Sequence, residues 1–546
     1  MTGAEILVRC LMEAGVDTIP LLCGNGLNPI LYEAKRAGIR LIDTRNEQAA
    51  SYIADGYARL TRRLGVCAVS SAVGHTNALI GVLNAYFDGA PLLLLSGHST
   101  RALGEVGVFQ ELDQVGMLKG ITKYAAEVAA PENLPFYLRE AMATAISGRP
   151  GPTHLTVPLN VLEAEVPAEQ VRWQRMPKAV VPAAGFASAC EVTEAVRLLA
   201  QAQRPVLVAG SGLFYAGAAK ALAQLAGGLS LPVITPIWDR GVVERESEWF
   251  LGVVGAASGG PRLLPDADLV ILAGARVDYR TRLGPMPGIT SEARIIRISG
   301  DSGELRQGIE PDVALLGDPA AILGQLAEEA RRQGLAGYAS WLAEARSRDC
   351  EFRCRWAAGP AQSGAMTGHH VVEALRPFLN EDTVFLVDGG NIGQWAHMVL
   401  AARRYPSDWL TCGASGVVGW GIPGAMAARL AYPGRPVILL SGDGAFTFTV
   451  ADLESAARQN LPFVVVLADD CAWGIVVSGQ CQAYGPDGAV CSRTGPIDYV
   501  KLAQSLGCLG LEATRPEEIG PAVEQGLRAD RPTIVHVPIA TGGPAD

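Results

Sequence analysis

Two adjacent carboxylates, Asp469 and Asp470, follow the apolar run FVVVLA at residues 463–468. A short run rich in β-branched residues predicts a buried strand, and both carboxylates would stand at its end. Ionised carboxylates are seldom buried unless they are paired or bind a metal. The rest of the sequence must therefore supply a cation or another partner for them.

A third carboxylate, Asp443, precedes Asp470 by 27 residues (470 minus 443), in the segment SGDGAFTFTVADLES at 441–455. Glycines where a strand meets a helix let the backbone approach a phosphate, and the helix N-terminus favours anions. An aspartate cannot bind phosphate directly, so we expect Asp443 to hold a cation that does. Neighbouring parallel strands end on one edge of a sheet, so Asp443 and Asp470 should face one crevice. Such oxygen ligands predict Mg²⁺, completed by water and a diphosphate.

Each of these two carboxylates also has a purely structural interpretation. Asp443 could cap a helix after a glycine turn, and Asp470 could cap the turn that follows its strand. The pairing of Asp443 and Asp470 at this spacing favours the metal site.

Several segments resemble one enzyme family. The GDG motif, followed about 27 residues later by a polar pair and an aromatic-Gly, resembles the thiamine-diphosphate signature. The chain is similar to the acetohydroxyacid synthase-like enzymes (acetolactate synthase and benzoylformate decarboxylase) over nearly its whole length. Segments that resemble their pyrimidine-binding domain are RNEQAASYIADGYARLT (45–61), SAVGHTNALIGVLNAYFDGAPLLLLSGHS (71–99), FQELDQVGMLKGITKY (109–124) and RPGPTHLTVPLNV (149–161). Segments that resemble their diphosphate-binding domain are DGGNIGQWA (388–396) and GASGVVGWGIPGAMAA (413–428).

The resemblance implies a role for particular residues. Glu47 matches the catalytic glutamate that hydrogen-bonds the aminopyrimidine ring of the cofactor, and a carboxylate in an apolar pocket can share a proton with a ring nitrogen. Asp443 and Asp470 match the Mg²⁺ ligands, with the carbonyl of Ala472 as the third. The cofactor-binding residues that the resemblance implies are Gly390, Asn391, Ile392, Val418, Gly442, Gly444 and Ala445. In the family, an apolar side chain at the position of Val418 holds the cofactor in its bent shape. The structural alternatives are a charge on the surface of a helix for Glu47 and an ordinary core valine for Val418.

The chain also departs from the family pattern. The family usually has asparagine where this chain has Asp469 and Asp470, and the Pro-Gly pair of the N-terminal substrate loop is Cys23-Gly24 here. Gly479 stands where the true acetohydroxyacid synthases carry a tryptophan that selects the acceptor. Its loss should enlarge the pocket and argues against simple acetolactate synthesis. The substrate-pocket candidates are Asn25, His75, Gln110, Ile475 and Gly479, and a structural histidine is the alternative for His75.

The elements that must position these residues alternate along the chain. Apolar runs such as those at 66–72, 91–97, 205–212, 269–275, 383–390 and 436–444 are separated by helical patterns, which predicts an α/β protein with mostly parallel sheets flanked by helices. Stretches of low order at 163–185 and 348–368 mark the boundaries. We expect a pyrimidine-binding domain at 1–165, a central domain at 186–335 and a diphosphate- and Mg-binding domain at 366–546. The outer two share a local plan of strand, glycine turn, helix, proline and strand.

Composition excludes several other classes of protein. The net charge of −10 argues against nucleic acid as the main partner. The eleven cysteines are scattered without zinc-ligand spacing, so we expect reduced thiols in a cytoplasmic protein. The N-terminal segment alternates charges at helical spacing, unlike a signal peptide, and the longest apolar runs are far too short to span a membrane.

The resemblance implies a reaction and an assembly. It implies decarboxylation of a 2-oxo acid donor and addition of the product to a carbonyl acceptor, with active sites at the chain interface of a homodimer or homotetramer. The central segments GSGLFYAGAAKALAQLA (210–226) and GARVDYRTR (274–282) resemble regions that bind FAD or ADP in some members and no nucleotide in others. The alternatives are a 2-oxo acid decarboxylase, a C–C lyase or hydrolase of the same family, and a catalytically silent binding protein. A dinucleotide oxidoreductase would need the motif G-x-G-x-x-G in the first strand-to-helix turn of a domain, and no segment of this chain supplies it.

Overall fold

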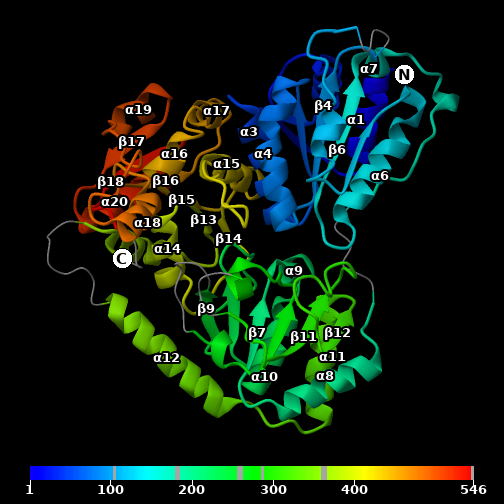
Figure 1. Cartoon of the computed structure of the whole chain (residues 1–546). Helices are drawn as coiled ribbons and strands as arrows, with labels where there is room; N and C mark the ends of the chain where they lie inside the picture. Colours follow the sequence, from blue (N-terminus) through cyan, green and yellow to red (C-terminus); the bar gives the residue numbers. More distant parts are fainter. Residues whose placement is uncertain (102–105, 179–184, 255–261, 284–287, 358–365, 543–546) are drawn as a thin grey trace.

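The computed structural model describes residues 1–101, 106–178, 185–254, 262–283, 288–357 and 366–542. These residues form three lobes, each built on one six-stranded sheet in which every described strand pair is parallel (Figure 1). Helices cover the sheets, so the predicted α/β class with three parallel sheets is confirmed. Among the described residues no helix is both long enough and apolar enough to cross a membrane.

The three sheets follow one another along the chain. The first lobe contains β1 (Thr18–Leu21), β2 (Arg40–Asp43), β3 (Gly65–Val69), β4 (Leu92–His98), β5 (Tyr124–Glu127) and β6 (Pro152–Pro158). The central lobe contains β7 (Pro205–Ala209), β8 (Val233–Pro236), β9 (Phe250–Val254), β10 (Leu269–Ala273), β11 (Arg294–Ser299) and β12 (Val313–Leu316). The third lobe contains β13 (Val384–Asp388), β14 (Trp409–Thr411), β15 (Val437–Gly442), β16 (Val464–Asp469), β17 (Leu509–Glu512) and β18 (Thr533–Pro538).

The outer lobes share one strand order. The first sheet runs β2-β1-β3-β4-β6-β5 and the third runs β14-β13-β15-β16-β18-β17, which is the same order once twelve is subtracted from each number. The central sheet runs β12-β11-β10-β7-β8-β9, the order of a dinucleotide-type doubly wound sheet. Ligands bind such sheets at the carboxyl ends of the strands, at the switch point where two successive connections leave one strand toward opposite edges of the sheet. Those switch points lie between β1 and β3, β7 and β10, and β13 and β15.

The helices pack on both faces of the sheets. The first lobe has α1 (Gly3–Glu13), α2 (Asn28–Arg36), α3 (Glu47–Thr61), α4 (Val73–Asp88), α5 (Gln114–Leu118), α6 (Leu134–Ile146) and α7 (Leu159–Glu163). The central lobe has α8 (Ala189–Gln201), α9 (Ser211–Tyr215), α10 (Ala219–Leu229), α11 (Pro319–Arg332) and α12 (Ala339–Ala357). The third lobe has α13 (Gly368–Leu375), α14 (Asn391–Trp395), α15 (Gly421–Ala431), α16 (Asp443–Thr447), α17 (Asp452–Arg458), α18 (Gly474–Tyr484), α19 (Tyr499–Ser505) and α20 (Pro516–Leu527).

Local sequence explains why these elements form where they do. The first five residues of β15 and all six of β16 are buried, because helices cover both faces of a parallel sheet. The helix α3 begins where the side chain of Asn46 accepts a hydrogen bond from the N–H of Gln48, a standard helix cap. This cap places Glu47 at the first position of a helix that is buried on most of its surface.

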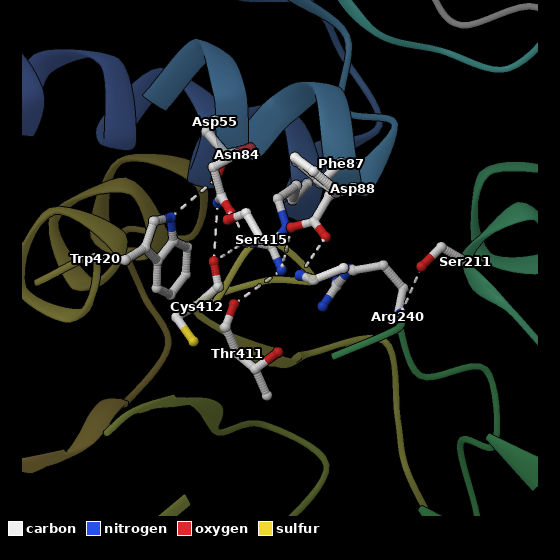
Figure 2. Close-up of polar contacts among 12 residues, drawn as sticks. Asp55, Asn84, Phe87, Asp88, Ser211, Arg240, Thr411, Cys412, Ser415 and Trp420 are labelled. Atoms are coloured by element: carbon white, nitrogen blue, oxygen red, sulfur yellow. Dashed lines mark hydrogen bonds and ion pairs between the residues drawn. The ribbon is translucent and has the colours of Figure 1, made fainter. Parts of the chain in front are cut away.

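A buried polar network joins the first lobe to the third (Figure 2). The carboxylate of Asp55 on α3 accepts hydrogen bonds from Asn84 and from the indole N–H of Trp420, each at 2.9 Å. The guanidinium of Arg59 lies between Asp55 and Asp88 and donates to the carbonyl of Thr411. All of these side chains are buried, and buried charges persist only when they are paired and hydrogen-bonded. The network fixes α3 and α4 against α15.

The expectation of low order was wrong for part of one stretch. The stretch 348–368 was expected to have low order, but residues up to Ala357 continue the helix α12. Ion pairs one turn apart explain the helix, because Arg348 pairs with Glu344 and Arg353 with Asp349. In the other stretch, 163–185, the structure has only the end of α7 and one short turn, and residues 179–184 lie outside the described part. The domain limits 1–165, 186–335 and 366–546 stay a prediction.

Candidate active site

The paired carboxylates meet at the carboxyl ends of β15 and β16, next to the switch point between β13 and β15. Asp443 begins α16 directly after β15, and Asp470 follows β16, with Gly442 and Ala468 in register on the two strands. The two carboxyl groups are close enough to share a hydrogen bond. Burial, and then the charge of Asp443, raise the pKa of Asp470. Burial also raises the pKa of Asp443. The charge of Asp443 disfavours ionisation of Asp470, and the charge of Asp469 disfavours ionisation of Asp443, so a cation would stabilise this site.

Asp469 has a different partner from Asp470. Its carboxylate is only 7% exposed and lies 2.9 Å from Nε2 of His536 on the neighbouring strand β18. Although burial disfavours its charge, the hydrogen bonds from His536 and from the N–H of Cys471 keep the pKa of Asp469 below its usual value. The two adjacent carboxylates therefore diverge, one toward β18 and the other toward the crevice.

A cavity of about 220 Å³ opens beside Asp443 and Asp470. Every residue that the sequence predicted for the cofactor and the metal lines it, namely Gly390, Asn391, Ile392, Val418, Gly442, Asp443, Gly444, Ala445, Asp470 and Ala472. Ile475, a predicted pocket residue, lines it as well. Val418 is half-buried at the cavity, whereas its neighbour Val417 packs in the core. The structure thus brings segments that follow four strands, β13, β14, β15 and β16, to one place.

The cavity suits a diphosphate held through a cation. No Cβ could be added to Gly390 or Gly444 without approaching Ile475 and the ring of Trp473 within 3 Å, so only glycine fits at these two positions of the cavity wall. The buried amide nitrogen of Asn391 finds no acceptor among the described residues and is free to donate to a ligand. The described residues hold no group of three or more metal-binding side chains. Two carboxylates and a carbonyl suit Mg²⁺, which keeps waters and phosphate oxygens as its other ligands.

Thr494 is a residue of this site that the sequence did not suggest. Its hydroxyl lies 3.3 Å from Oδ2 of Asp443, and its N–H donates to the carbonyl of Cys471. Thr494 thereby connects the two loops that carry the carboxylates. It lies 51 residues beyond Asp443 in an irregular segment, so no strand or helix pattern indicated it.

Glu47 occupies the first turn of α3 and is 7% exposed. Its Oε2 accepts a hydrogen bond of 3.0 Å from the amide of Asn77 on α4. Its Oε1 faces Gly74, where an added Cβ would lie 2.8 Å away. The glycine therefore leaves one carboxylate oxygen accessible while Asn77 holds the other. Asn77 stands in the quoted segment VGHTN, but nothing in its spacing marked it as a partner of Glu47.

Two predicted pocket residues meet at the switch point of the first sheet. The amide of Asn25 donates to the hydroxyls of Ser71 and Ser99, each at 3.0 Å. The hydroxyl of Ser71 donates in turn to Oε1 of Gln110 at 2.8 Å. Gln110 has a φ of 59°, a conformation that non-glycine residues adopt only when their surroundings fix it. These four residues form a polar cluster that could face a substrate.

The other two pocket candidates are placed differently. His75 is fully buried, and its Nδ1 lies 2.8 Å from the hydroxyl of Ser96, which also contacts His154. Burial lowers the pKa of His75 to about 4, so the ring is neutral and does not line the cavity. Gly479 lies on α18 with open space where its side chain would be, and it also lies outside the cavity lining.

The two halves of the predicted site do not meet within one chain. The cavity is lined by residues of the third lobe and by Trp238 of the central lobe, and no described residue of the first lobe lines it. Glu47, Asn25 and Gln110 all lie on the first lobe. A second copy of the chain would have to bring Glu47 to the cavity.

A smaller cavity lies at the switch point of the central sheet. It measures about 70 Å³ and is lined by Ser211, Gly212, Gly274 and Arg276. Arg149 of the first lobe crosses it and contacts Oε1 of Glu304 at 3.0 Å. Ligand pockets usually measure about 300–1,000 Å³. This cavity is smaller than that range, and the binding of FAD or another adenine nucleotide stays a prediction.

Three descriptions of one enzyme family match the chain in order. They are the N-terminal TPP binding domain of thiamine pyrophosphate enzymes at residues 1–117, their central domain at 192–326, and their C-terminal TPP binding domain at 388–537. An acetolactate synthase of Mycobacterium bovis is 31% identical over 98% of this chain and 87% of its own length. The acetolactate synthase isozyme 2 large subunit of Escherichia coli is 29% identical over 99% of this chain and 96% of its own. A probable acetolactate synthase large subunit of Methanocaldococcus jannaschii is 28% identical over 99% and 92%.

Proposed function

The chain belongs to the thiamine pyrophosphate enzymes, and we propose that it is a carboligase that joins a 2-oxo acid donor, with loss of CO₂, to a carbonyl acceptor. The observation that carries this proposal is the cavity beside Asp443 and Asp470, which gathers every predicted cofactor and metal residue. The family of the relatives supports carboligation, and the names of these relatives point to acetolactate synthesis. We propose a different or larger acceptor for this chain.

The residues of the cavity would hold the cofactor through Mg²⁺. Asp443, Asp470 and the carbonyl of Ala472 would bind the cation, whose charge offsets the two carboxylates and the diphosphate. The side-chain amide of Asn391 and the backbone N–H of Gly390, both at the cavity, would donate to diphosphate oxygens. Thiamine diphosphate, when bound, supplies an electron sink for a carbanion next to a carbonyl.

Glu47 would hold the proton that activates the cofactor. Its Oε1, left accessible by Gly74, would share a proton with a ring nitrogen of the aminopyrimidine. Its Oε2 would stay bonded to Asn77, which fixes the orientation of the carboxylate. The apolar and glycine-rich surroundings would exclude water from this proton transfer.

The acceptor proposal rests on Gly479. The family's true synthases have a tryptophan at this position, and here the side chain is replaced by open space on α18. Gly479 lies outside the cavity that one chain lines, so it would widen the substrate space only where a second chain completes the site, and that space would admit an acceptor larger than pyruvate. The polar cluster of Asn25, Ser71, Ser99 and Gln110 would then supply hydrogen bonds to substrate oxygens.

The assembly follows from the separation of Glu47 and the cavity. We propose a homodimer or homotetramer in which the first lobe of one chain completes the cavity of another. We also propose a cytoplasmic location. The reaction proposed here needs no FAD or other adenine nucleotide, and its binding to the central segments stays a prediction.

A substrate screen by mass spectrometry tests the reaction. Protein, thiamine diphosphate and Mg²⁺ are incubated with a panel of 2-oxo acids, with and without aldehydes and ketones. We expect a coupled product that contains the decarboxylated donor and the acceptor, and no product from Asp443→Ala. Free aldehyde without a coupled product would instead make the protein a decarboxylase. Silence from every donor would indicate cleavage of a preformed C–C bond or a binding protein without catalysis.

A further inference from the structure

Trp238 adopts a backbone conformation that a bulky residue rarely tolerates. It follows β8 in the central lobe with a φ of 74°. A non-glycine residue at positive φ stores strain, which persists only where the surrounding structure fixes it and which occurs most often at functional sites. The contacts of its neighbours therefore show whether the surrounding structure holds the backbone of Trp238 at this positive φ.

The residues on both sides of Trp238 are held by buried side chains. Arg280 donates to the carbonyl of Ile237 at 2.7 Å and lies 3.2 Å from Oδ1 of Asp239. The hydroxyl of Ser211 donates to the same carboxylate oxygen and accepts the N–H of Arg240 at 2.9 Å. Arg280, Asp239 and Arg240 are all buried.

The hydrogen bonds that hold the Trp238 loop extend to the third lobe. The guanidinium of Arg240 donates to the carbonyls of Trp409 and Ser407, on and just before β14 (Figure 2 labels Arg240 and Ser211). The loop that carries Trp238 is thus fixed to the central lobe on one side and to the third lobe on the other. Its position relative to the cavity is built into the interface between the two lobes.

The indole of Trp238 lies against the cofactor cavity. It is the one described residue outside the third lobe that lines this cavity. Its ring packs edge-on against the buried His397, with centroids 5.6 Å apart and planes at 87°. A hydrogen bond joins it to the hydroxyl of Tyr279, which fixes the direction of the indole. The ring is only half-buried, so part of its surface remains available to a ligand.

We infer that Trp238 is a specificity-determining wall of the cofactor cavity, supplied by the central lobe, which limits the size of the 2-oxo acid side chain held beside the cofactor. The inference rests on the proposed function for its substrate class. Its evidence is independent of that function, because it comes from the positive φ of Trp238, the hydrogen bonds that hold its loop, and the half-buried ring at the cavity. Removal of the indole should widen the cavity.

Two variants and a matched control test this inference. Trp238→Phe keeps an apolar ring and removes the indole, and Trp238→Ala removes the wall. Trp249, another half-buried tryptophan of the central lobe, lies against Gly227 and outside the cavity, so Trp249→Phe and Trp249→Ala are the controls. Thermal unfolding of each variant establishes that it is folded.

The first measurement is the change in tryptophan fluorescence when thiamine diphosphate and Mg²⁺ are added. We expect quenching in the wild type and in Trp249→Phe, and a clearly smaller quench in Trp238→Phe at saturating cofactor. An unchanged quench in Trp238→Phe would overturn the inference. This measurement needs no substrate, so it decides the position of Trp238 even if the screen for carboligation fails.

The second measurement is the ratio of kcat/KM for a 2-oxo acid with a bulky side chain to kcat/KM for pyruvate. Contacts in an apolar pocket discriminate by about tenfold or more per methylene group. We expect the ratio to rise by about tenfold or more in Trp238→Ala and to stay unchanged in Trp249→Ala. A reduced quench with an unchanged ratio would overturn the specificity role.

Discussion

Glu47 combines burial, a fixed orientation and one accessible oxygen. Asn77 holds its Oε2, and the missing side chain of Gly74 leaves its Oε1 open. A carboxylate that only capped a helix would need neither arrangement. The position of Glu47 at the start of α3 was predictable from the cap residue Asn46, whereas its bond to Asn77 depends on how α3 and α4 pack.

The first prediction concerns this carboxylate. Glu47→Gln keeps the size and the hydrogen bond to Asn77 but cannot share a proton in the same way, so we expect turnover to fall by about 10²–10⁴-fold with folding intact. Steady-state kinetics with saturating cofactor measure the effect. Glu191→Gln, in the exposed first turn of α8, is the control and should retain full activity. Full activity in Glu47→Gln would refute the role.

Asp388 couples the stability of the third lobe to pH. It ends β13 and accepts the N–H of Gly421 at 2.6 Å, and burial raises its pKa from 3.8 to about 7. The folded chain therefore keeps a proton that the unfolded chain releases, so the free energy of unfolding falls as pH rises from about 4 to about 7. Each pKa unit corresponds to about 1.4 kcal/mol.

The second prediction follows from this sign. Asp388→Asn keeps an acceptor for Gly421 but cannot ionise, so its stability should fall less than that of the wild type over this pH range. Urea unfolding at pH values of about 5 and about 8 measures both proteins. Identical pH dependence in the two would contradict the role of Asp388.

At the scale of elements, α3 and α15 approach closely because small residues line their contact. Gly56 of α3 lies against Ala427 and the ring of Trp420, and Gly424 of α15 lies against the same ring. Trp420 is fully buried and bonded to Asp55, so it cannot move aside. The close contact holds the first lobe on the third.

The third prediction compares two helix glycines. A Cβ on Gly424 would lie 2.5 Å from the Trp420 ring, so we expect Gly424→Ala to destabilise the protein by about 1–3 kcal/mol. Gly324, inside α11, has nothing within 4 Å of such a Cβ, and Gly324→Ala should stabilise by up to about 1 kcal/mol. Chemical denaturation measures both variants. Stabilisation by Gly424→Ala would show that the helices are less closely fixed.

The elements also show what the sequence can and cannot reveal. The apolar runs predicted β3, β4, β7, β10, β13, β15 and β16, because strands buried on both faces need continuous apolar residues. The convergence of Asp443 and Asp470 followed from the rule that parallel strands end on one edge. The same rule did not predict the partner of Asp469, because His536 lies 67 residues away on another strand. Trp238 was missed for the same reason, since its strain and its place at the cavity depend on the packing of two lobes.

At the scale of the whole molecule, the outer lobes repeat one topology and carry complementary halves of the site. Glu47 and the polar cluster lie at the carboxyl ends of the strands of the first sheet, and the carboxylate pair lies at the carboxyl ends of β15 and β16 in the third. Within one chain α3, α4 and α15 fix these lobes so that the halves stay apart (Figure 1). A symmetric pair of chains would bring each half to its complement twice.

The fourth prediction tests this arrangement by complementation. Glu47→Gln damages only the first lobe and Asp443→Ala only the third, so a mixed dimer contains one site with both defects and one intact site. Co-expression in equal amounts should restore about a quarter of wild-type activity, because about half of the dimers are mixed and each has one working site of two. Activity no higher than that of the separate variants would place the complete site within one chain.

Binding of the cofactor to the carboxylate pair tests the central claim most directly. In isothermal titration calorimetry we expect the wild type to bind thiamine diphosphate when Mg²⁺ is present and far more weakly when it is chelated. Asp443→Ala and Asp470→Ala should lose binding, whereas Asp470→Asn keeps an oxygen ligand and should retain it. Binding that is equally tight without Mg²⁺, or that survives in both alanine variants, would contradict the assignment of this cavity.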